Sequence, residues 1–156
     1  MSEAQQQPMF SIEKIYVKDL SLEVPGGPQT FMQPEQPQLE VQLTQQSQRV
    51  NDVLFEVTLV VSVSAKKGDK TLFLVEVSQA GVFQIRNVPE ADLAPVLGMV
   101  CPNVLFPYAR ETVSDVITRA GFPSVLLAPV NFEALYQQRA AESAAKPGGA
   151  SIEIAH

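Results

Sequence analysis

The sequence has very little cysteine and histidine, and these shortages exclude several classes of protein. Its one cysteine, Cys101, cannot form an intramolecular disulfide and suits a reducing compartment. Its only histidine is the last residue, His156, so Ser-His-Asp, Cys-His and histidine-dependent zinc chemistry have no internal histidine to use. Neither a G-x-G-x-x-G nor a G-x-x-x-x-G-K-[ST] motif occurs, and phosphate-binding loops of those kinds are therefore not expected. We expect no enzyme, metal or cofactor, although carboxylate pairs can act without histidine.

Charged residues are scarce as well. They make up 18% of the 156 residues, whereas hydrophobic residues make up 46%, and typical domains carry about 25% charged residues. Because monomers rarely expose large apolar patches, we expect part of the apolar surface to face a partner. The net charge of −6 disfavours nucleic acids and anionic membranes as partners.

The chain also lacks a long uninterrupted hydrophobic run. Its N-terminus has neither the basic nor the apolar region of a secretory signal. The longest uncharged stretch, residues 93–109, is too short and too rich in proline for an ordinary membrane-spanning helix. We expect a soluble cytoplasmic protein with a flexible N-terminus (residues 1–8), one domain (9–143) and a mobile C-terminal tail (144–156).

Four segments alternate between apolar and polar residues with a period of two, the pattern typical of strands. They are residues 10–24, 39–44, 53–64 and 71–85. One face of each is apolar and the other largely polar, which indicates an antiparallel sheet. Residues 66–70 are expected to form a hairpin turn. Residues 25–38 contain four prolines, which prevent ladder pairing through most of the segment, and we expect a strap that crosses a sheet edge or face.

The periodicity changes to that of helices after residue 85. Residues 89–92 are typical of a first helical turn, and a stronger helix is predicted from about 103 to 120, with Gly121 as its C-cap. Asn131 suits the N-cap of a last helix, 132–143. Strands followed by helices predict an α+β fold, with a four-stranded antiparallel sheet and helices packed on one face.

Three surfaces are candidates for partner binding. Helix 103–120 is flanked by uncharged segments and is expected to be buried in an oligomer. The strap and the last helix could form an apolar groove for extended segments, although Phe31 and Tyr136 could equally plug the edge of the core. Asp19 and Glu23 share a face of the first strand, as Leu74 and Glu76 share a face of the fourth. An apolar residue within such an acidic face suits a basic docking partner.

Three strings resemble the SecB family of bacterial protein-export chaperones. They are CPNVLFPYARETVSDVITRAGFPSVLLAPVNFEALY (101–136), IYVKDLSLEVP (15–25) and FLVEVSQAGVF (73–83). The resemblance implies an ATP-independent holdase that binds unfolded preproteins and passes them to the SecA ATPase. It also implies a homotetramer built as a dimer of dimers. The alternative function is a small-ligand-binding or carboxylate-dependent α+β domain.

The resemblance also assigns roles to individual residues. The positions implied to dock SecA are Asp19, Glu23, Leu74 and Glu76. The positions implied for the client groove are Phe31, Val41, Leu43 and Tyr136, with Leu39, Phe132 and Leu135 as weaker candidates. The positions implied to support oligomer assembly are Val75, Val77 and Gln79, whose inward-facing pattern fits a packing role.

Overall fold

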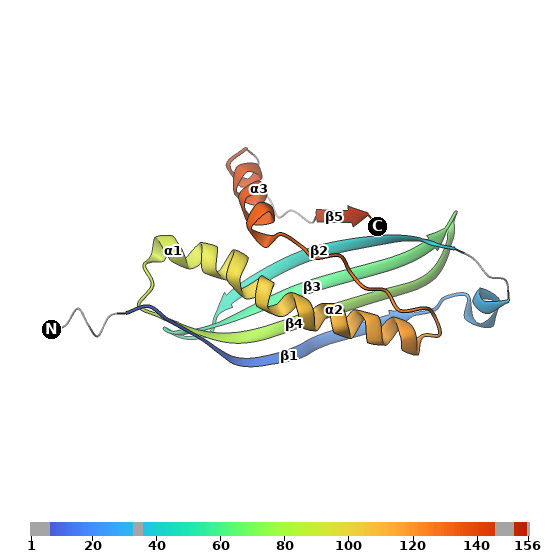
Figure 1. Ribbon diagram of the computed structural model, residues 1–156, viewed down its shortest axis with the longest axis horizontal. Helices are drawn as coiled ribbons and strands as arrows, with labels where there is room; N and C mark the ends of the chain where they lie inside the picture. Colours follow the sequence, from blue (N-terminus) through green and yellow to red (C-terminus); the bar gives the residue numbers. More distant parts are fainter. Residues whose placement is uncertain (1–6, 33–35, 146–151, 156) are drawn as a thin grey trace.

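The computed structural model describes residues 7–32, 36–145 and 152–155 and consists of a curved sheet with helices on one face (Figure 1). The strands are β1 (Met9–Glu23), β2 (Gln38–Arg49), β3 (Leu54–Lys67), β4 (Lys70–Arg86) and β5 (Ile152–Ala155), in the spatial order β1-β4-β3-β2-β5. All neighbouring strands are antiparallel. The helical elements are the 3₁₀-helix η2 (Gly27–Phe31), α1 (Glu90–Pro95), the π-helix η3 (Val96–Val100), α2 (Cys101–Arg119) and α3 (Phe132–Ala145).

The α+β fold class and the four expected strands are confirmed, and the sheet contains one strand more. Residues 152–155, which the sequence analysis places in a mobile tail, form β5 and pair with Glu40–Leu43 of β2. A four-residue strand has too few positions to show a period of two clearly, so the pattern gives no signal for it. The rest of the expected tail beyond residue 145, and residues 1–6 of the expected N-terminal segment, lie outside the described residues.

The core lies between one face of the sheet and α2. The inner rows of β3 and β4 are buried, among them Val61 and Val77, each with no exposed surface. Leu105, Val113 and Ile117 of α2 pack into the same cluster and are equally buried. Burial of these aliphatic side chains is the main favourable contribution to folding, so the inner face of the sheet is occupied by the chain's own helix.

Irregular pairing explains why the apolar pattern of the first strand is mixed. The register of β1 against β4 shifts between Ile12 and Lys14 and again between Val17 and Asp19. Each extra residue in a bulge reverses which face the following side chains occupy. The expected hairpin is regular at its tip, where Lys67 pairs with Lys70 and Gly68 adopts a φ of +60°, a conformation that suits glycine.

The helical run is longer than the sequence predicts. The expected short helix and the helix 103–120 are joined through η3 into one run from Glu90 to Arg119. Within η3 the wider turn bonds the amide of Cys101 to the carbonyl of Val96. Pro102 has no amide hydrogen to donate, and the π-helical turn lies directly before it. The predicted N-cap is confirmed, since Asn131 accepts a hydrogen bond from the amide of Ala134. The C-cap of α2 is Ala120, one residue before the predicted Gly121, which follows it with a φ of +96°.

Exposed apolar side chains gather on β1 rather than on α2. Most apolar residues of α2 face the sheet of this chain, although Tyr108 is exposed. The exposed apolar residues of β1 are Met9, Phe10, Ile12, Val17, Leu20 and Leu22. Because β1 is an edge strand, these residues adjoin unpaired backbone groups, which can pair with another chain. None of the helices in the described ranges is both long enough and apolar enough to cross a membrane.

Candidate functional site

An apolar pocket of about 580 Å³ lies where the strap approaches the end of the sheet, and we call it the strap pocket. The strap contributes Thr30 and Phe31, and β4 contributes Leu72 and Phe73. The segment after α2, from Gly121 to Val125, lines it as well. Leu72 is buried because the β3–β4 pairing is irregular there: Phe73 pairs with Ala65 and Thr71 with Lys66, so Leu72 has no partner.

Three phenylalanine rings form the wall of this pocket. The centroids of Phe31 and Phe122 are 5.2 Å apart, and those of Phe122 and Phe73 are 4.8 Å apart. Phe73 is buried, whereas Phe31 is 52% exposed. The absence of a side chain at Gly121 permits this packing, since a Cβ atom there would lie 3.2 Å from the Phe31 ring. The row of rings therefore leads from solvent to the core and offers an aromatic surface to an apolar ligand.

A second pocket, of about 400 Å³, lies between α3, η3 and β2, and we call it the α3 pocket. Tyr136 of α3 lies against Gly98 of η3, where a Cβ atom would approach the ring to within 2.5 Å. Gly98 is therefore required for the close approach of these two helices. Polar residues of β2, beginning with Gln45, and Arg139 of α3 also line the pocket.

The seven residues expected in a single client groove are divided between these pockets and the core. Phe31 and Leu39 line the strap pocket, and Tyr136 lines the α3 pocket. Val41, Leu43 and Phe132 are buried, and Phe132 packs edge-on against Phe106 at 5.8 Å. Leu135 is half-buried against the core. The sequence did not identify Phe73 and Phe122 as pocket residues, because both look like ordinary core residues. The one available signal for Phe122 is the preceding glycine, which allows close packing of the rings.

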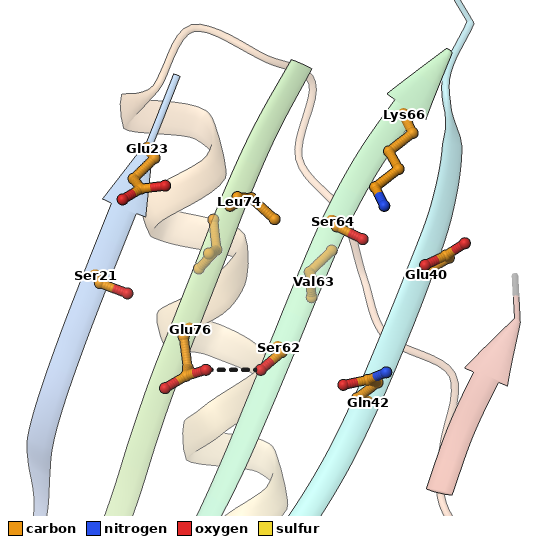
Figure 2. Close-up of a pocket in the computed structure, with 11 residues that line it drawn as sticks. Ser21, Glu23, Glu40, Gln42, Ser62, Val63, Ser64, Lys66, Leu74 and Glu76 are labelled. Carbon is orange, nitrogen blue, oxygen red and sulfur yellow. Dashed lines mark hydrogen bonds between the residues drawn. The ribbon is translucent and has the colours of Figure 1, made fainter. Parts of the chain in front are cut away.

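The outer face of the sheet carries a polar pocket of about 410 Å³, which we call the acidic face (Figure 2). Glu23, Leu74 and Glu76, three of the four expected docking residues, line it. Figure 2 shows the side chain of Glu76 directed toward Ser62 of β3, whose hydroxyl donates a hydrogen bond of 3.1 Å to Glu76. The other polar residues that line this pocket are Ser21, Glu40, Gln42, Ser64 and Lys66, and Val63 and Val75 complete the lining.

Strand register determines the composition of the acidic face. Glu23 pairs with Leu74, Ser21 with Glu76, and Asp19 with Ser78, and directly paired residues of adjacent strands share a face. Asp19 therefore extends the acidic face along β1, although it does not line the pocket itself. Leu74 is 39% exposed and provides an apolar contact among the carboxylates. The carboxylates lie along the exposed face of a sheet rather than converging in an enclosed cavity.

A polar cluster on the outer face ties β1 to β3. The hydroxyl of Tyr16 donates a hydrogen bond to Glu56, and Lys18 forms an ion pair of 2.8 Å with the same carboxylate. The hydrogen bonds from Lys18 and Tyr16 lower the pKa of Glu56. Burial and the neighbouring carboxylate raise the pKa of Tyr16 to about 12. The cluster spans β4 and so fixes the position of the edge strand that carries Asp19 and Glu23.

The residues expected to support assembly lie on the inner face. Val75 and Val77 are buried. Gln79 is buried too, and its Nε2 donates to the carbonyl of Tyr16 at 3.2 Å while its Oε1 accepts from Thr112 at 3.3 Å. Because both ends of this buried amide are hydrogen-bonded, no polar atom of it is left unpaired in the core. Gln79 thus connects β1, β4 and α2.

The described residues contain no group of three or more histidine, cysteine, aspartate or glutamate side chains that could hold a metal ion. Cys101 is buried at the start of α2, and its burial raises the pKa of the thiol to about 12. The thiol therefore remains protonated at neutral pH, whereas the thiolate is the reactive form.

Comparison with known proteins gives consistent matches over most of the chain. The family model described as preprotein translocase subunit SecB matches residues 3–143. A protein-export protein SecB of Chromobacterium violaceum is 63% identical over 145 residues, which are 92% of this chain and 97% of that protein. A protein-export protein SecB of Nitrosospira multiformis is 60% identical over 139 residues, 89% of this chain and 87% of that protein.

A solved structure shares the fold. It is a SecB-like chaperone of Mycobacterium tuberculosis in complex with a ChAD peptide from the HigA1 antitoxin, and it aligns with a TM-score of 0.63. The alignment covers 78% of this chain and 90% of that chain at 15% sequence identity. At this identity the similarity establishes the architecture of the sheet and helices.

Proposed function

The chain belongs to the SecB family of preprotein translocase subunits, and we propose that it is a holdase that binds unfolded preproteins without nucleotide and delivers them to the SecA ATPase. Its mechanism is thermodynamic. Binding to the unfolded state of a client lowers the concentration of free client that can fold, by mass action. The client then stays competent for export until a motor protein takes it over in the cytoplasm.

The strap pocket supports client binding. Its aromatic row is open to solvent at Phe31 and ends in the core at Phe73, so an apolar side chain of a client can be buried there without unfolding the chaperone. Aromatic and aliphatic walls accept many apolar shapes, and such surfaces suit ligands of varied sequence. Tyr136 and the α3 pocket supply a second contact region on the other side of the buried residues Val41 and Leu43.

The acidic face supports docking of SecA. Asp19, Glu23 and Glu76 present carboxylates around the exposed Leu74. A basic partner surface with an apolar residue at its centre complements this arrangement. Charge complementarity at such a surface mainly increases the association rate and the specificity.

The apolar row on β1 supports assembly into a homotetramer, a dimer of dimers. The six apolar residues exposed on this strand in the single chain lie along an open sheet edge, where a second copy could bury them. The expected solution mass is about four times the 17.0 kDa of the chain. Several copies would let one long client engage several pockets at once, so that weak individual contacts add up to tight binding.

The observation that carries this proposal is that the two binding surfaces use opposite faces of the same sheet. On β4, Phe73 lines the strap pocket while its neighbour Leu74 lines the acidic face. A client on one face therefore leaves the other face free for the motor protein. Simultaneous occupancy is what delivery of a client requires.

The experiment that tests the proposal is the refolding of a slow-folding preprotein in the absence of nucleotide. We expect substoichiometric tetramer to delay recovery of the native fluorescence of the preprotein, and addition of purified SecA to form a ternary complex detectable by light scattering. A refolding rate that stays unchanged at every ratio of chaperone to client would contradict the proposal. A stable monomer in solution would contradict the assembly.

A further inference from the structure

Two buried polar atoms in the α3 pocket have no hydrogen-bond partner among the described residues. They are Oε1 of Gln45, an acceptor on β2, and Nε of Arg139, a donor on α3. Each side chain also makes one hydrogen bond: Nε2 of Gln45 donates to the carbonyl of Gly98 at 3.1 Å, and Nη2 of Arg139 donates to the carbonyl of Leu43 at 3.3 Å. An unpaired buried group costs about 1–3 kcal/mol, so this pair calls for an explanation.

The two atoms form a complementary set. One N–H donor and one carbonyl acceptor line the same pocket, together with the apolar side chains of Ala94, Leu97 and Ala140. A peptide unit presents the converse pair, an N–H and a C=O, and every client has this unit whatever its sequence. A carboxylate could pair with the guanidinium of Arg139 but has no hydrogen to donate to the oxygen of Gln45, whereas a peptide group can satisfy both atoms.

Within the described residues, the backbone of β2 next to this pocket has no strand partner on one side. β5 pairs with β2 only from Glu40 to Leu43, and of the strands in the described ranges none pairs with Thr44–Arg49 on that side. Arg139 bonds the carbonyl of Leu43, at the end of the β5 ladder. An extended segment can add to such an edge through its main chain, and it would pass directly beneath α3.

The attachment of α3 allows access to these atoms. Among its described side chains only Phe132, at its first residue, is buried, and Figure 1 shows the helix rising away from the sheet beyond that end. Arg139 lies in the outer half of the helix and is half-buried. Burial lowers the pKa of its guanidinium, because the charge is partly desolvated. Lifting of the outer half of α3 would expose both unpaired groups, in exchange for the hydrogen bond from Arg139 to Leu43.

We propose that Gln45 and Arg139 form a backbone-recognition site for extended client segments, in which Nε–H of Arg139 donates to a client carbonyl and Oε1 of Gln45 accepts a client amide hydrogen. This inference rests on the proposed client binding and adds a polar element to it. The strap pocket takes up apolar side chains of the client, and the α3 pocket holds its main chain. A contact to the main chain explains how recognition tolerates varied client sequences.

The test measures the affinity of the full-length chain for a short, apolar, fluorescein-labelled peptide, acetylated and amidated so that it carries no terminal charge. By fluorescence anisotropy, Arg139→Met and Gln45→Met each weaken binding about fivefold, as expected for one lost hydrogen bond in a desolvated site. Arg139→Lys weakens it similarly, because lysine keeps the charge but lacks the guanidinium Nε–H. The matched controls Gln138→Met on α3 and Arg119→Met on α2, both at exposed positions, leave the affinity unchanged.

A second probe identifies the chemical group that is recognised. The same peptide with one central amide replaced by an ester lacks one N–H. If Gln45 accepts that hydrogen, Gln45→Met should not weaken binding of the ester peptide any further. Wild-type affinity in both variants, with native melting curves, would overturn the inference while leaving the proposed function intact. An effect confined to a peptide with a free carboxylate would also overturn it, in favour of an anion site. Wild-type protein that neither binds the peptide nor delays refolding would instead contradict the proposed function.

Discussion

The two faces of β4 differ in burial and in charge. Val75 and Val77 point into the core and are buried, whereas Leu74 and Glu76, one residue away, lie on the acidic face. The inner face tolerates no charge, because an unpaired buried charge is strongly destabilising. The outer face carries carboxylates whose replacement leaves the core intact. The two faces can therefore serve different partners without sharing side chains.

The largest expected effect comes from moving a charge from the outer to the inner face. Val77→Asp places an unpaired carboxylate where no surface is exposed, and we expect a loss of about 4 kcal/mol or more in the free energy of unfolding, enough to prevent folding. Glu76→Gln, at the adjacent outer position, should change the stability by less than about 0.5 kcal/mol. Urea denaturation followed by circular dichroism measures both. Equal losses in the two variants would show that the faces are not distinct.

This alternation made most of the fold predictable from the sequence. The inner rows of β3 and β4 follow a strict period of two, and recognisable residues, Gly121 and Asn131, mark the end of α2 and the start of α3. β1 was less clear, because two bulges reverse its faces in a way that no local residue signals. The continuous helical run was missed since prolines normally end helices, and the π-helical turn of η3 lies between two of them, Pro95 and Pro102.

The two proposed binding surfaces were predictable to different degrees, because one depends on strand alternation and the other on tertiary packing. The acidic face follows from strand alternation and register, and three of its four expected residues line one pocket. The groove depends on how the strap and α3 fold back over the sheet, which is a tertiary property. Phe31 and Tyr136 were expected together but line two separate pockets, and Phe122 was missed since its partners lie far from it in the sequence.

The next prediction tests whether clients bind in the strap pocket rather than elsewhere on the helix-covered face of the sheet. Phe122→Ala removes the central ring between Phe31 and Phe73, and we expect the affinity for an unfolded preprotein to fall about tenfold through lost aromatic contacts. Leu126→Ala, in the same segment but 75% exposed, is the matched control and should bind normally. Isothermal titration with a permanently unfolded client measures both. A similar loss in Leu126→Ala would mean that clients bind outside the strap pocket.

Charge reversal on the acidic face should have a smaller effect, and it should weaken binding of SecA rather than of the client. Asp19→Lys combined with Glu76→Lys is expected to weaken SecA binding about fivefold at low salt, and less at high salt because exposed charges are screened. Client affinity should stay unchanged, because both side chains lie across the sheet from the strap pocket. Surface plasmon resonance at two salt concentrations gives the SecA affinity. Parallel losses in SecA and client binding would assign these residues a structural role.

The last prediction concerns the polar cluster of Tyr16, Lys18 and Glu56, which links non-adjacent strands on the outer face. Glu56 has a lowered pKa in the folded protein, so its contribution is present above the ordinary glutamate pKa of about 4.3 and is lost as the pH falls through the folded value. Tyr16 has its pKa raised to about 12, so its contribution is present below about 10 and is lost as the pH rises toward 12. Tyr16→Phe should cost about 1 kcal/mol at neutral pH and flatten the alkaline limb of the stability curve, while Glu56→Gln flattens the acid limb. Urea denaturation across the pH range tests both, and an unchanged pH dependence in either variant would show that the outer face is stabilised by the ladder of the sheet alone.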